Sequence, residues 1–312
     1  MEKLKIVFFG TPEFATFSLN KLFKNKYIIQ AVVTATDKKS GRGKKLQYSH
    51  VKEYCLENNI NLLQPESLKS TKFLRELKLL QTDLFVVVAY RMLPRLVWQI
   101  PNKGTINLHA SILPQLRGAA PIQWAIINGL SETGLTTFFI NEKIDSGDVL
   151  LQKKVKIAED ENFGSLHDKL MLEGGKILVS TIKLLESKKY KAIKQNLDKT
   201  HLTAPKLDKN NTRINWKKSG IYISNLIKGL SPYPGAWTQI LGSNFTIKIF
   251  SAFYIESGTN SSIRFKIEKN KLMILIRDGH LEIDEIQIEG KKRMNSKEFI
   301  NGYRNFNNVE LY

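Results

Sequence analysis

The stretch DLFVVVAYRMLPRLVWQIPNKGTINLHA (83–110) decides the fold class of this 312-residue chain. It contains two short runs rich in apolar residues, DLFVVVAY (83–90) and GTINLHA (104–110). The first run is the most apolar in the chain, and a continuous apolar run of this length is typical of a strand buried on both faces. Strands of this kind are usual in parallel sheets that are covered by helices.

The same alternation of strand and helix patterns extends outward from this stretch in both directions. Further strands are expected at residues 4–10, 27–35, 61–65, 134–141 and 148–157, and helices at 13–24, 49–59, 70–80, 120–129 and about 165–186. Strands that alternate with helices predict an α/β domain with a doubly wound, mostly parallel, Rossmann-like sheet. Ligands of such sheets bind at the carboxyl ends of the strands, so functional residues are expected directly after strands.

The pattern changes after residue 186, and this change predicts two domains. Residues 187–213 hold few apolar side chains, and between 183 and 213 there are nine basic and three acidic residues. Beyond them come short alternating strands separated by turn residues, which is typical of a small antiparallel barrel or sandwich. We therefore predict a first domain at 1–186, a basic linker at 187–213 and a small OB-like β-barrel at 214–312.

The charge of the chain favours a polyanionic partner. Lys and Arg number 48 against 29 Asp and Glu, which gives a net charge of +19. A surplus of this size attracts nucleic acid through its long-range field. The alternative is a compositional bias, because the chain is also rich in Lys, Asn and Ile.

The number of cysteines and the length of the hydrophobic runs indicate in which cellular compartment the protein works. The only cysteine is Cys55, so an intrachain disulfide is impossible and a metal site would depend on His and carboxylates. The apolar run at the N-terminus is short and is typical of a first strand, not of a signal peptide. No run approaches the roughly 20 apolar residues of a membrane span. We expect a cytoplasmic protein that binds no membrane and no metal.

The segment GTINLHASILPQLRGAAPIQWA (104–125) carries the strongest candidate site. Asn107 and His109 lie two apart on one strand, so their side chains share a face. Two polar side chains on a buried strand need a partner or a function. The alternative is a buried Asn–His pair that only satisfies backbone groups, but its place at the end of a strand, before a stiff loop, favours function.

Two further loops follow strands and carry charges. Asp145 lies in NEKIDSGDVL (141–150) and could orient a histidine or a water, although Asp and Gly are also ordinary turn residues. The loop ATDKKSGRGKKLQ (35–47) holds five cations between residues 38 and 45, among glycines that predict flexibility. Such a loop suits phosphate groups, and the alternative is a solvated surface loop.

Several catalytic motifs are missing from the sequence. FFGTPEF (8–14) has only Gly10 of a dinucleotide-binding fingerprint, and there is no P-loop, no G-x-S-x-G and no zinc-ligand spacing. Covalent catalysis has little support from a single cysteine. Direct group transfer, assisted by residues that stabilise developing charge, fits better.

These segments together identify a family. The chain closely resembles the methionyl-tRNA formyltransferases, of the folate-dependent formyltransferase superfamily, over nearly its whole length. The motifs that carry the resemblance are FFGTPEFA (8–15), SGRGKKL (40–46), AYRMLP (89–94), INLHASILPQLRGAAPI (106–122), IDSGDVLL (144–151) and GLSPYPGAWT (229–238). The family often has Gly in place of Arg91 and Arg or Trp in place of Gln115 and Leu116. These departures leave the catalytic candidates intact but could alter the lining of the folate pocket.

The resemblance implies a reaction and roles for the candidate residues. The formyl group of 10-formyltetrahydrofolate would pass to the amino group of methionyl-initiator tRNA, for translation initiation. Asn107 and His109 would donate hydrogen bonds to the oxyanion of the tetrahedral intermediate, and His109 would carry a proton to the leaving folate nitrogen. Asp145 would favour protonated His109. The residues expected to line the folate site are Ser111, Ile112, Leu113 and Pro114.

The resemblance also implies how tRNA is held. The first domain would bind folate and perform catalysis, and tRNA would run along the basic loop, the linker and the barrel. Such phosphate contacts position the substrate without reading its sequence. We expect a monomer. The cations expected at the acceptor end of the tRNA are Lys38, Lys39, Arg42, Lys44 and Lys45.

Three other functions are compatible with parts of this pattern. A formyltransferase of the same superfamily that acts on an amino sugar or a purine precursor would share Asn107, His109 and Asp145 without needing the basic loop. A related hydrolase would use water as the acceptor. A noncatalytic RNA-binding protein would explain the charge but not these three residues.

Overall fold

A computed structural model describes residues 3–40, 45–198, 201–242, 245–258 and 262–312. The chain forms two compact units that are interleaved along the sequence. The first comprises residues 1–118, 133–155 and 168–203, and the second comprises 119–132, 156–167 and 204–312. Each unit is described by itself below.

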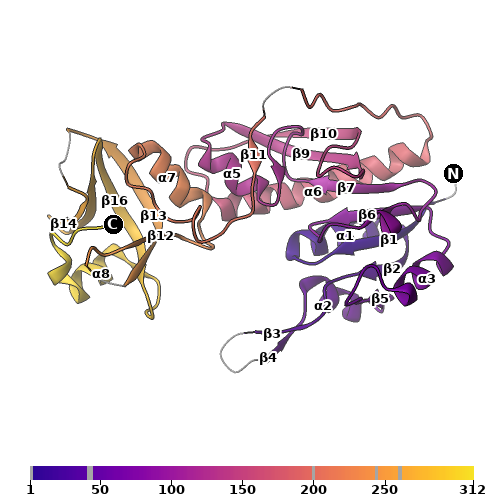
Figure 1. Cartoon of the computed structure of the whole chain (residues 1–312), viewed down its shortest axis with the longest axis horizontal. Coiled ribbons are helices and arrows are strands. Elements are labelled where there is room, and N and C mark those ends of the chain that lie inside the picture. The colour runs from indigo at the N-terminus through magenta and orange to yellow at the C-terminus, as the bar shows by residue number, and fades with distance from the viewer. Residues whose placement is uncertain (1–2, 41–44, 199–200, 243–244, 259–261) are drawn as a thin grey trace. The chain divides into compact units, whose positions relative to one another are not determined.

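The first unit is built on a mixed sheet of seven strands in the order β10-β9-β7-β6-β1-β2-β5 (Figure 1). Its strands are β1 (Lys5–Gly10), β2 (Ile28–Val33), β5 (Leu62–Leu63), β6 (Leu84–Val88), β7 (Thr105–His109), β9 (Glu132–Phe139) and β10 (Val149–Lys156). Neighbours from β5 through β7 pair in parallel, whereas β9 runs antiparallel to β7. The predicted doubly wound, mostly parallel sheet is confirmed. All five residues of β6 are buried, as the apolar run 83–90 indicated.

Helices cover this sheet on both faces. They are α1 (Glu13–Lys24), α2 (His50–Glu57), α3 (Thr71–Leu79), α4 (Arg95–Trp98) and α6 (Phe163–Glu186). Ser49 and Ser70 cap α2 and α3 by accepting a backbone N–H from the first turn, so these helices begin where a Ser precedes the apolar pattern. Phe73 and Leu77 of α3 pack into an apolar cluster with alternate residues of β1, β2 and β6.

Cys55 lies fully buried in α2. Burial raises the pKa of its thiol to about 12, which keeps it an inert apolar side chain at neutral pH. Among the described residues, no helix is both long enough and apolar enough to cross a membrane.

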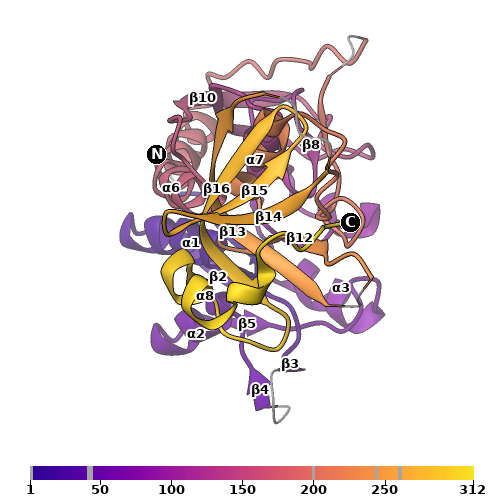
Figure 2. The same ribbon diagram turned by 90° about the vertical axis from the view of Figure 1, so that its left-hand side faces the viewer.

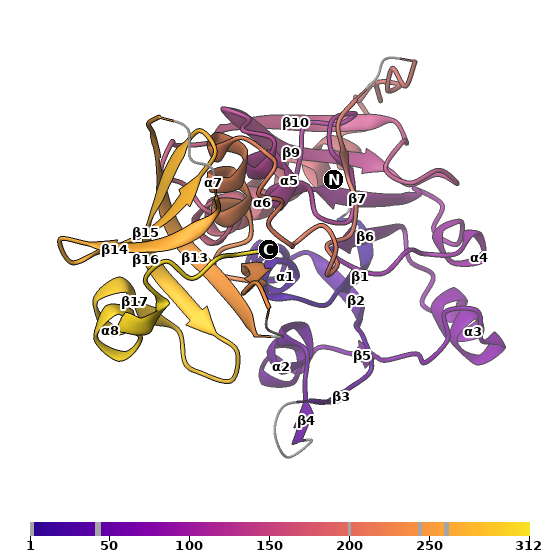
Figure 3. The ribbon, with the colours of Figure 1, turned by 60° about the vertical axis from the view of Figure 1, so that its left-hand side comes forward.

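The described ends of the basic loop after β2 form paired strands, which the prediction of a flexible loop did not anticipate. Strands β3 (Lys38–Ser40) and β4 (Lys45–Gln47) pair as an antiparallel hairpin that extends beyond α2 (Figure 3). Asp37 anchors the base of the hairpin, because its carboxylate accepts hydrogen bonds from Gln64 and from Lys52. These two bonds hold the pKa of Asp37 below its usual range.

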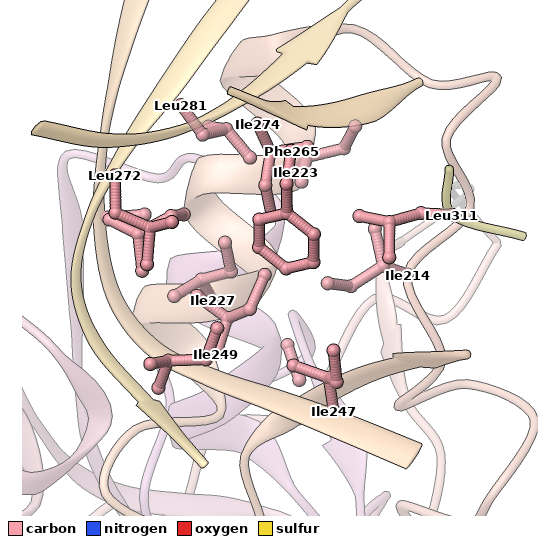
Figure 4. Close-up of a cluster of buried hydrophobic side chains, with 14 of the residues drawn as sticks. Ile214, Ile223, Ile227, Ile247, Ile249, Phe265, Leu272, Ile274, Leu281 and Leu311 are labelled. Atoms are coloured by element: carbon pink, nitrogen blue, oxygen red, sulfur yellow. The ribbon is translucent and has the colours of Figure 1, made fainter. Parts of the chain in front are cut away.

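The second unit is an antiparallel sheet in the order β12-β13-β16-β15-β14, with β17 beside β16. Its strands are β12 (Ala236–Gln239), β13 (Thr246–Glu256), β14 (Arg264–Glu268), β15 (Lys271–Ile276), β16 (Gly279–Ile288) and β17 (Met294–Asn295). Its helical elements are α5 (Pro121–Ile127), α7 (Gly220–Gly229), α8 (Ser296–Gly302) and the 3₁₀ turn η1 (Arg304–Phe306). α7 packs on β13, and α8 lies against β15 and β16 (Figure 2). Ile223 and Ile227 of α7 point into the core of the sheet (Figure 4).

The predicted barrel is not closed by its own strands, since β12 and β14 do not pair in the described sheet. The C-terminal residues link these two edges instead. The N–H groups of Asn308 and Leu311 donate to carbonyls on the β14 side, and that of Tyr312 donates to Gln239 of β12. The C-terminus therefore covers edges that would otherwise be open to pairing with another chain.

Candidate active site

Strand β7 places two polar side chains in the middle of the sheet of the first unit. Asn107 lies between Val87 of β6 and Phe138 of β9, and His109 lies opposite Thr136 of β9. The strand direction changes at this point, because β6 is parallel and β9 antiparallel to β7. Both residues lie on the predicted strand, at the end where it leaves the sheet.

The imidazole of His109 is hydrogen-bonded on one side, faces a carboxylate on the other and is buried, with only 6% of the residue exposed. Nε2 lies 2.9 Å from the carbonyl oxygen of Leu116, and Nδ1 lies 3.8 Å from Oδ2 of Asp145. A carbonyl only accepts, so Nε2 carries the proton. Nδ1 is then the nitrogen that can take up or release a second proton beside a carboxylate. The 3.8 Å separation is about 1 Å longer than a direct hydrogen bond.

Asp145 lies in the loop between β9 and β10, and a residue outside this loop binds its carboxylate. Its Oδ2 accepts the backbone N–H of Gly118 at 3.0 Å. Its backbone has φ +48°, in the left-handed region that costs a residue with a Cβ about 1 kcal/mol or more. Such a conformation persists only when surrounding contacts impose it, and in it the carboxylate faces His109.

Hydrogen bonds and one close approach set the shape of this loop. Oδ1 of Asn141 lies 2.9 Å from Oγ of Ser146 and accepts the N–H of Lys143 at 3.0 Å. At Gly147, an added Cβ would lie 1.6 Å from the carbonyl oxygen of Phe139. Only glycine fits there. Gly147 is therefore required by the packing of the loop and is not merely a common turn residue.

Asn107 contributes an uncommitted amide to the site. Within the described residues, its side chain forms no hydrogen bond, and the residue is half-buried. A half-buried amide without a protein partner can donate to a bound group without first breaking a protein contact.

The predicted folate-lining segment is rigid, and part of it faces inward. Ser111 and Leu113 are buried, whereas Ile112 and Pro114 are half-buried. Oγ1 of Thr136 donates to Ser111 O at 2.7 Å and accepts from Leu113 N at 3.1 Å.

Sequence reasoning missed three residues that shape this site: Thr136, Gln152 and Gln195. Gln152 of β10 donates to the carbonyl of Leu113 at 2.8 Å, and Gln195 donates to backbone carbonyls of the Asp145 loop. A polar residue within an apolar strand could have indicated Thr136. Gln195 lies in the predicted linker and has no sequence signal, because only the tertiary structure brings it to the loop.

The segment after α6 belongs to the first unit as far as residue 203. Gln115, one of the departures from the family pattern, accepts the N–H of Leu202 at 3.0 Å and lies 3.1 Å from Nδ1 of His201. Strand β8 (Arg117–Gly118) pairs with β11 (Thr203–Ala204).

Three of the five basic candidates, Lys38, Lys39 and Lys45, lie on strands β3 and β4. Lys38 is exposed on β3, and the backbones of Lys39 and Lys45 belong to the paired strands. Arg42 and Lys44 lie outside the described residues. Lys38 is therefore an exposed cation on the described part of this hairpin.

The chemistry available at this site is proton transfer and hydrogen-bond donation. The described residues contain no group of three or more His, Cys, Asp or Glu that could hold a metal ion. A histidine that faces a carboxylate beside a free amide can bind an anionic oxygen and exchange a proton with a neighbouring nitrogen.

Comparison with known proteins identifies relatives over the full length. Residues 4–182 match the family described as formyl transferase, and residues 206–304 match the formyl transferase C-terminal domain. The chain is 47% identical over 315 residues to the methionyl-tRNA formyltransferase of Flavobacterium johnsoniae, covering 100% of both chains. It is 42% identical to that of Bacteroides thetaiotaomicron, covering 97% of each.

Solved structures show the same fold at low sequence identity. One is WlaRD, a sugar 3N-formyl transferase determined in the presence of dTDP and 5-N-formyl-THF. It has a TM-score of 0.66 and 20% identity, covering 94% of this chain and 100% of that one. Another is HypX from Aquifex aeolicus in complex with tetrahydrofolic acid, with a TM-score of 0.64 and 17% identity, covering 96% of this chain and 47% of that one.

Proposed function

Because the chain belongs to the methionyl-tRNA formyltransferase family, we propose that Asn107, His109 and Asp145 catalyse formyl transfer from 10-formyltetrahydrofolate to the amino group of methionyl-initiator tRNA. The product is N-formylmethionyl-tRNA, used in translation initiation. The observation that carries the proposal is the contact between His109 and Asp145 beside the free amide of Asn107. Full-length identity of 47% to a named methionyl-tRNA formyltransferase supports the acceptor.

The three side chains have complementary roles in this reaction. The amine forms a bond to the formyl carbon, and the bond between that carbon and the folate nitrogen breaks. Asn107 stabilises the oxygen that becomes negative, a contribution of about 10²–10³ in rate for a well-placed donor. His109 relays a proton from the attacking amine to the leaving nitrogen, and Asp145 stabilises its charged form. Charges and protons balance over the whole step.

Folate recognition is assigned to the backbone and outward side chains of residues 111–114. The buried network of Thr136 and Gln152 keeps this segment in one conformation. Ile112 and Pro114 supply apolar contact, whereas Ser111 and Leu113 act by fixing the backbone. A rigid segment of this kind holds a ligand without an ordering cost on binding.

The tRNA is assigned to the basic hairpin, to the linker 187–213 and to the second domain at 214–312, while residues 1–186 bind folate and carry the catalysis. The enzyme acts as a monomer in the cytoplasm, where charged initiator tRNA is used. The net charge of +19 supports a polyanionic substrate.

Removing the hairpin cations is expected to weaken tRNA binding and to lower its dependence on salt. A variant with Ala at Lys38, Lys39, Arg42, Lys44 and Lys45 should show a shallower plot of log affinity against log salt, by about 0.7–0.9 for each phosphate that is no longer neutralised. The matched control replaces four exposed cations on or beside α3, namely Lys69, Lys72, Arg75 and Lys78. An unchanged slope in the hairpin variant, or an equal decrease in the control, would count against a specific role for the hairpin.

Single-turnover transfer of a labelled formyl group tests the reaction itself. Labelled 10-formyltetrahydrofolate is mixed with methionyl-initiator tRNA, with uncharged tRNA and with a free amino sugar. Label on the charged tRNA alone is expected. Label on the sugar, or release of labelled formate, would show that the enzyme transfers formyl groups to another acceptor. Binding of tRNA without any transfer would favour a noncatalytic RNA-binding protein.

A further inference from the structure

One buried polar residue stands out in the segment that follows α6. Between residues 187 and 198 every described residue is exposed or half-buried except Gln195, which is only 7% exposed. A glutamine buried in an otherwise solvated segment loses its water contacts and needs protein partners in return. Its partners therefore indicate what it does.

Both partners of the Gln195 amide belong to the loop that carries Asp145. Nε2 donates to the carbonyl oxygen of Asp145 at 3.0 Å and to that of Gly147 at 2.8 Å. An amide nitrogen has two N–H groups, and each is used by one carbonyl. The opposite orientation of the amide would place Oε1 against two acceptors, so the contacts fix which way the side chain points.

The backbone next to Gln195 is attached to the same loop. Ile193 and Val149 form an antiparallel bridge in which each N–H donates to the other's carbonyl at 2.8 Å. The segment thus reaches the loop through two backbone bonds at Val149 and two side-chain bonds at Asp145 and Gly147. The bridge places Gln195 next to the loop, and the Gln195 amide binds the part of the loop that contains Asp145.

The contact bears directly on the strained backbone of Asp145. A residue with φ +48° relaxes to a right-handed or extended conformation unless its peptide groups are held. Gly118 holds the carboxylate of Asp145, and Gln195 holds its carbonyl. These two contacts act at opposite ends of the same residue and together fix the direction of the carboxylate towards His109.

We propose that Gln195 is a positioning residue for the reaction, which holds Asp145 in its left-handed conformation against His109. The segment after α6 thereby belongs to the active site. This inference depends on the proposed role of Asp145 in catalysis. Its effect should appear in the rate of the chemical step and not in substrate binding, because Gln195 acts through Asp145.

The test is a double-mutant cycle between Gln195 and Asp145, measured by single-turnover transfer. Gln195→Met keeps the length of the side chain and removes both donors. It is expected to lower the transfer rate by about 10–100-fold, since a displacement of about 1 Å at a reacting group can cost as much. The KM values for folate and tRNA should change by less than about 3-fold. In the Asp145→Asn background the same substitution should cost less than about 3-fold, because coupled residues are not additive.

The matched control is Gln152→Met, which removes a donor to Leu113 in the neighbouring network. Its effect should be the same in both backgrounds, because it does not contact the Asp145 loop. Thermal unfolding of each variant shows whether the fold is kept. If Gln195→Met fails to fold, Gln195→Asn replaces it, since a shorter side chain reaches at most one of the two carbonyls.

The outcomes separate this inference from the proposed function. The positioning role would be overturned if Gln195→Met left the transfer rate unchanged, or if it lowered the rate equally in the wild-type and Asp145→Asn backgrounds. Either result would leave the role of Asp145 in place. A full rate in Asp145→Asn would overturn the catalytic assignment itself. A decrease that disappears in the Asp145→Asn background would establish both.

Discussion

Replacing His109 with Ala should lower the single-turnover rate of formyl transfer by about 10²–10⁴-fold, the usual contribution of a general acid or base. Nδ1 of the imidazole faces the carboxylate of Asp145, and Nε2 carries a proton. No other described residue of the site combines these two features. Without it, the proton released by the amine has no placed acceptor. The affinity for tRNA should be unchanged, because the proposed phosphate contacts lie elsewhere.

Two controls make this result specific. His109→Gln supplies an N–H that could still reach the Leu116 carbonyl but cannot exchange a proton, so its rate should be as low as that of His109→Ala. Thermal unfolding must show that both variants are folded, because His109 is buried and its removal leaves a space. A near-normal rate in either variant would show that the proton passes through water or through the substrates, and the proposed mechanism would be wrong.

The second large effect is expected for Gly147→Ala. Its Cβ would lie 1.6 Å from the carbonyl oxygen of Phe139, an approach that requires backbone to move, because no flexible side chain is there to yield. Overpacking of this kind costs about 1–3 kcal/mol of stability, and a rigid obstacle places it at the upper end. The shift also moves the carbonyl that Gln195 binds, and with it Asp145. We expect at least about a 10²-fold decrease in transfer rate.

Gly302→Ala is the matched control for this substitution. Gly302 ends α8, and a Cβ there would meet no atom within 4 Å. Chemical denaturation should place it within about 0.5 kcal/mol of the wild type, the range usual for surface substitutions. If Gly147→Ala were equally stable and fully active, the loop would not need its observed conformation, and both Asp145 and Gln195 would lose their assigned roles.

Most of the fold could be predicted because it depends on local patterns. The apolar run 83–90 became β6, and the amphipathic stretch 70–80 became α3 with its Ser cap. The prediction of a flexible basic loop was incomplete, because it did not foresee the local pairing of β3 with β4 or the anchor that Gln64, far along the chain, provides at Asp37. The barrel is not closed by its own strands, because C-terminal residues lie between the two edge strands and bond to both of them.

By itself, the sequence determined the class of chemistry and the place of Asn107 and His109, since a strand with period two puts both on one face and a strand end opens to ligand. Only the tertiary structure decided how they are used. It brought Oδ2 of Asp145 to 3.8 Å from Nδ1 of His109, and it bound Nε2 of His109 to a backbone carbonyl. It also placed Gln195, from the expected linker, in contact with the Asp145 loop. The physical reason is that hydrogen bonds between distant segments depend on how the chain packs, which no local pattern of residues encodes.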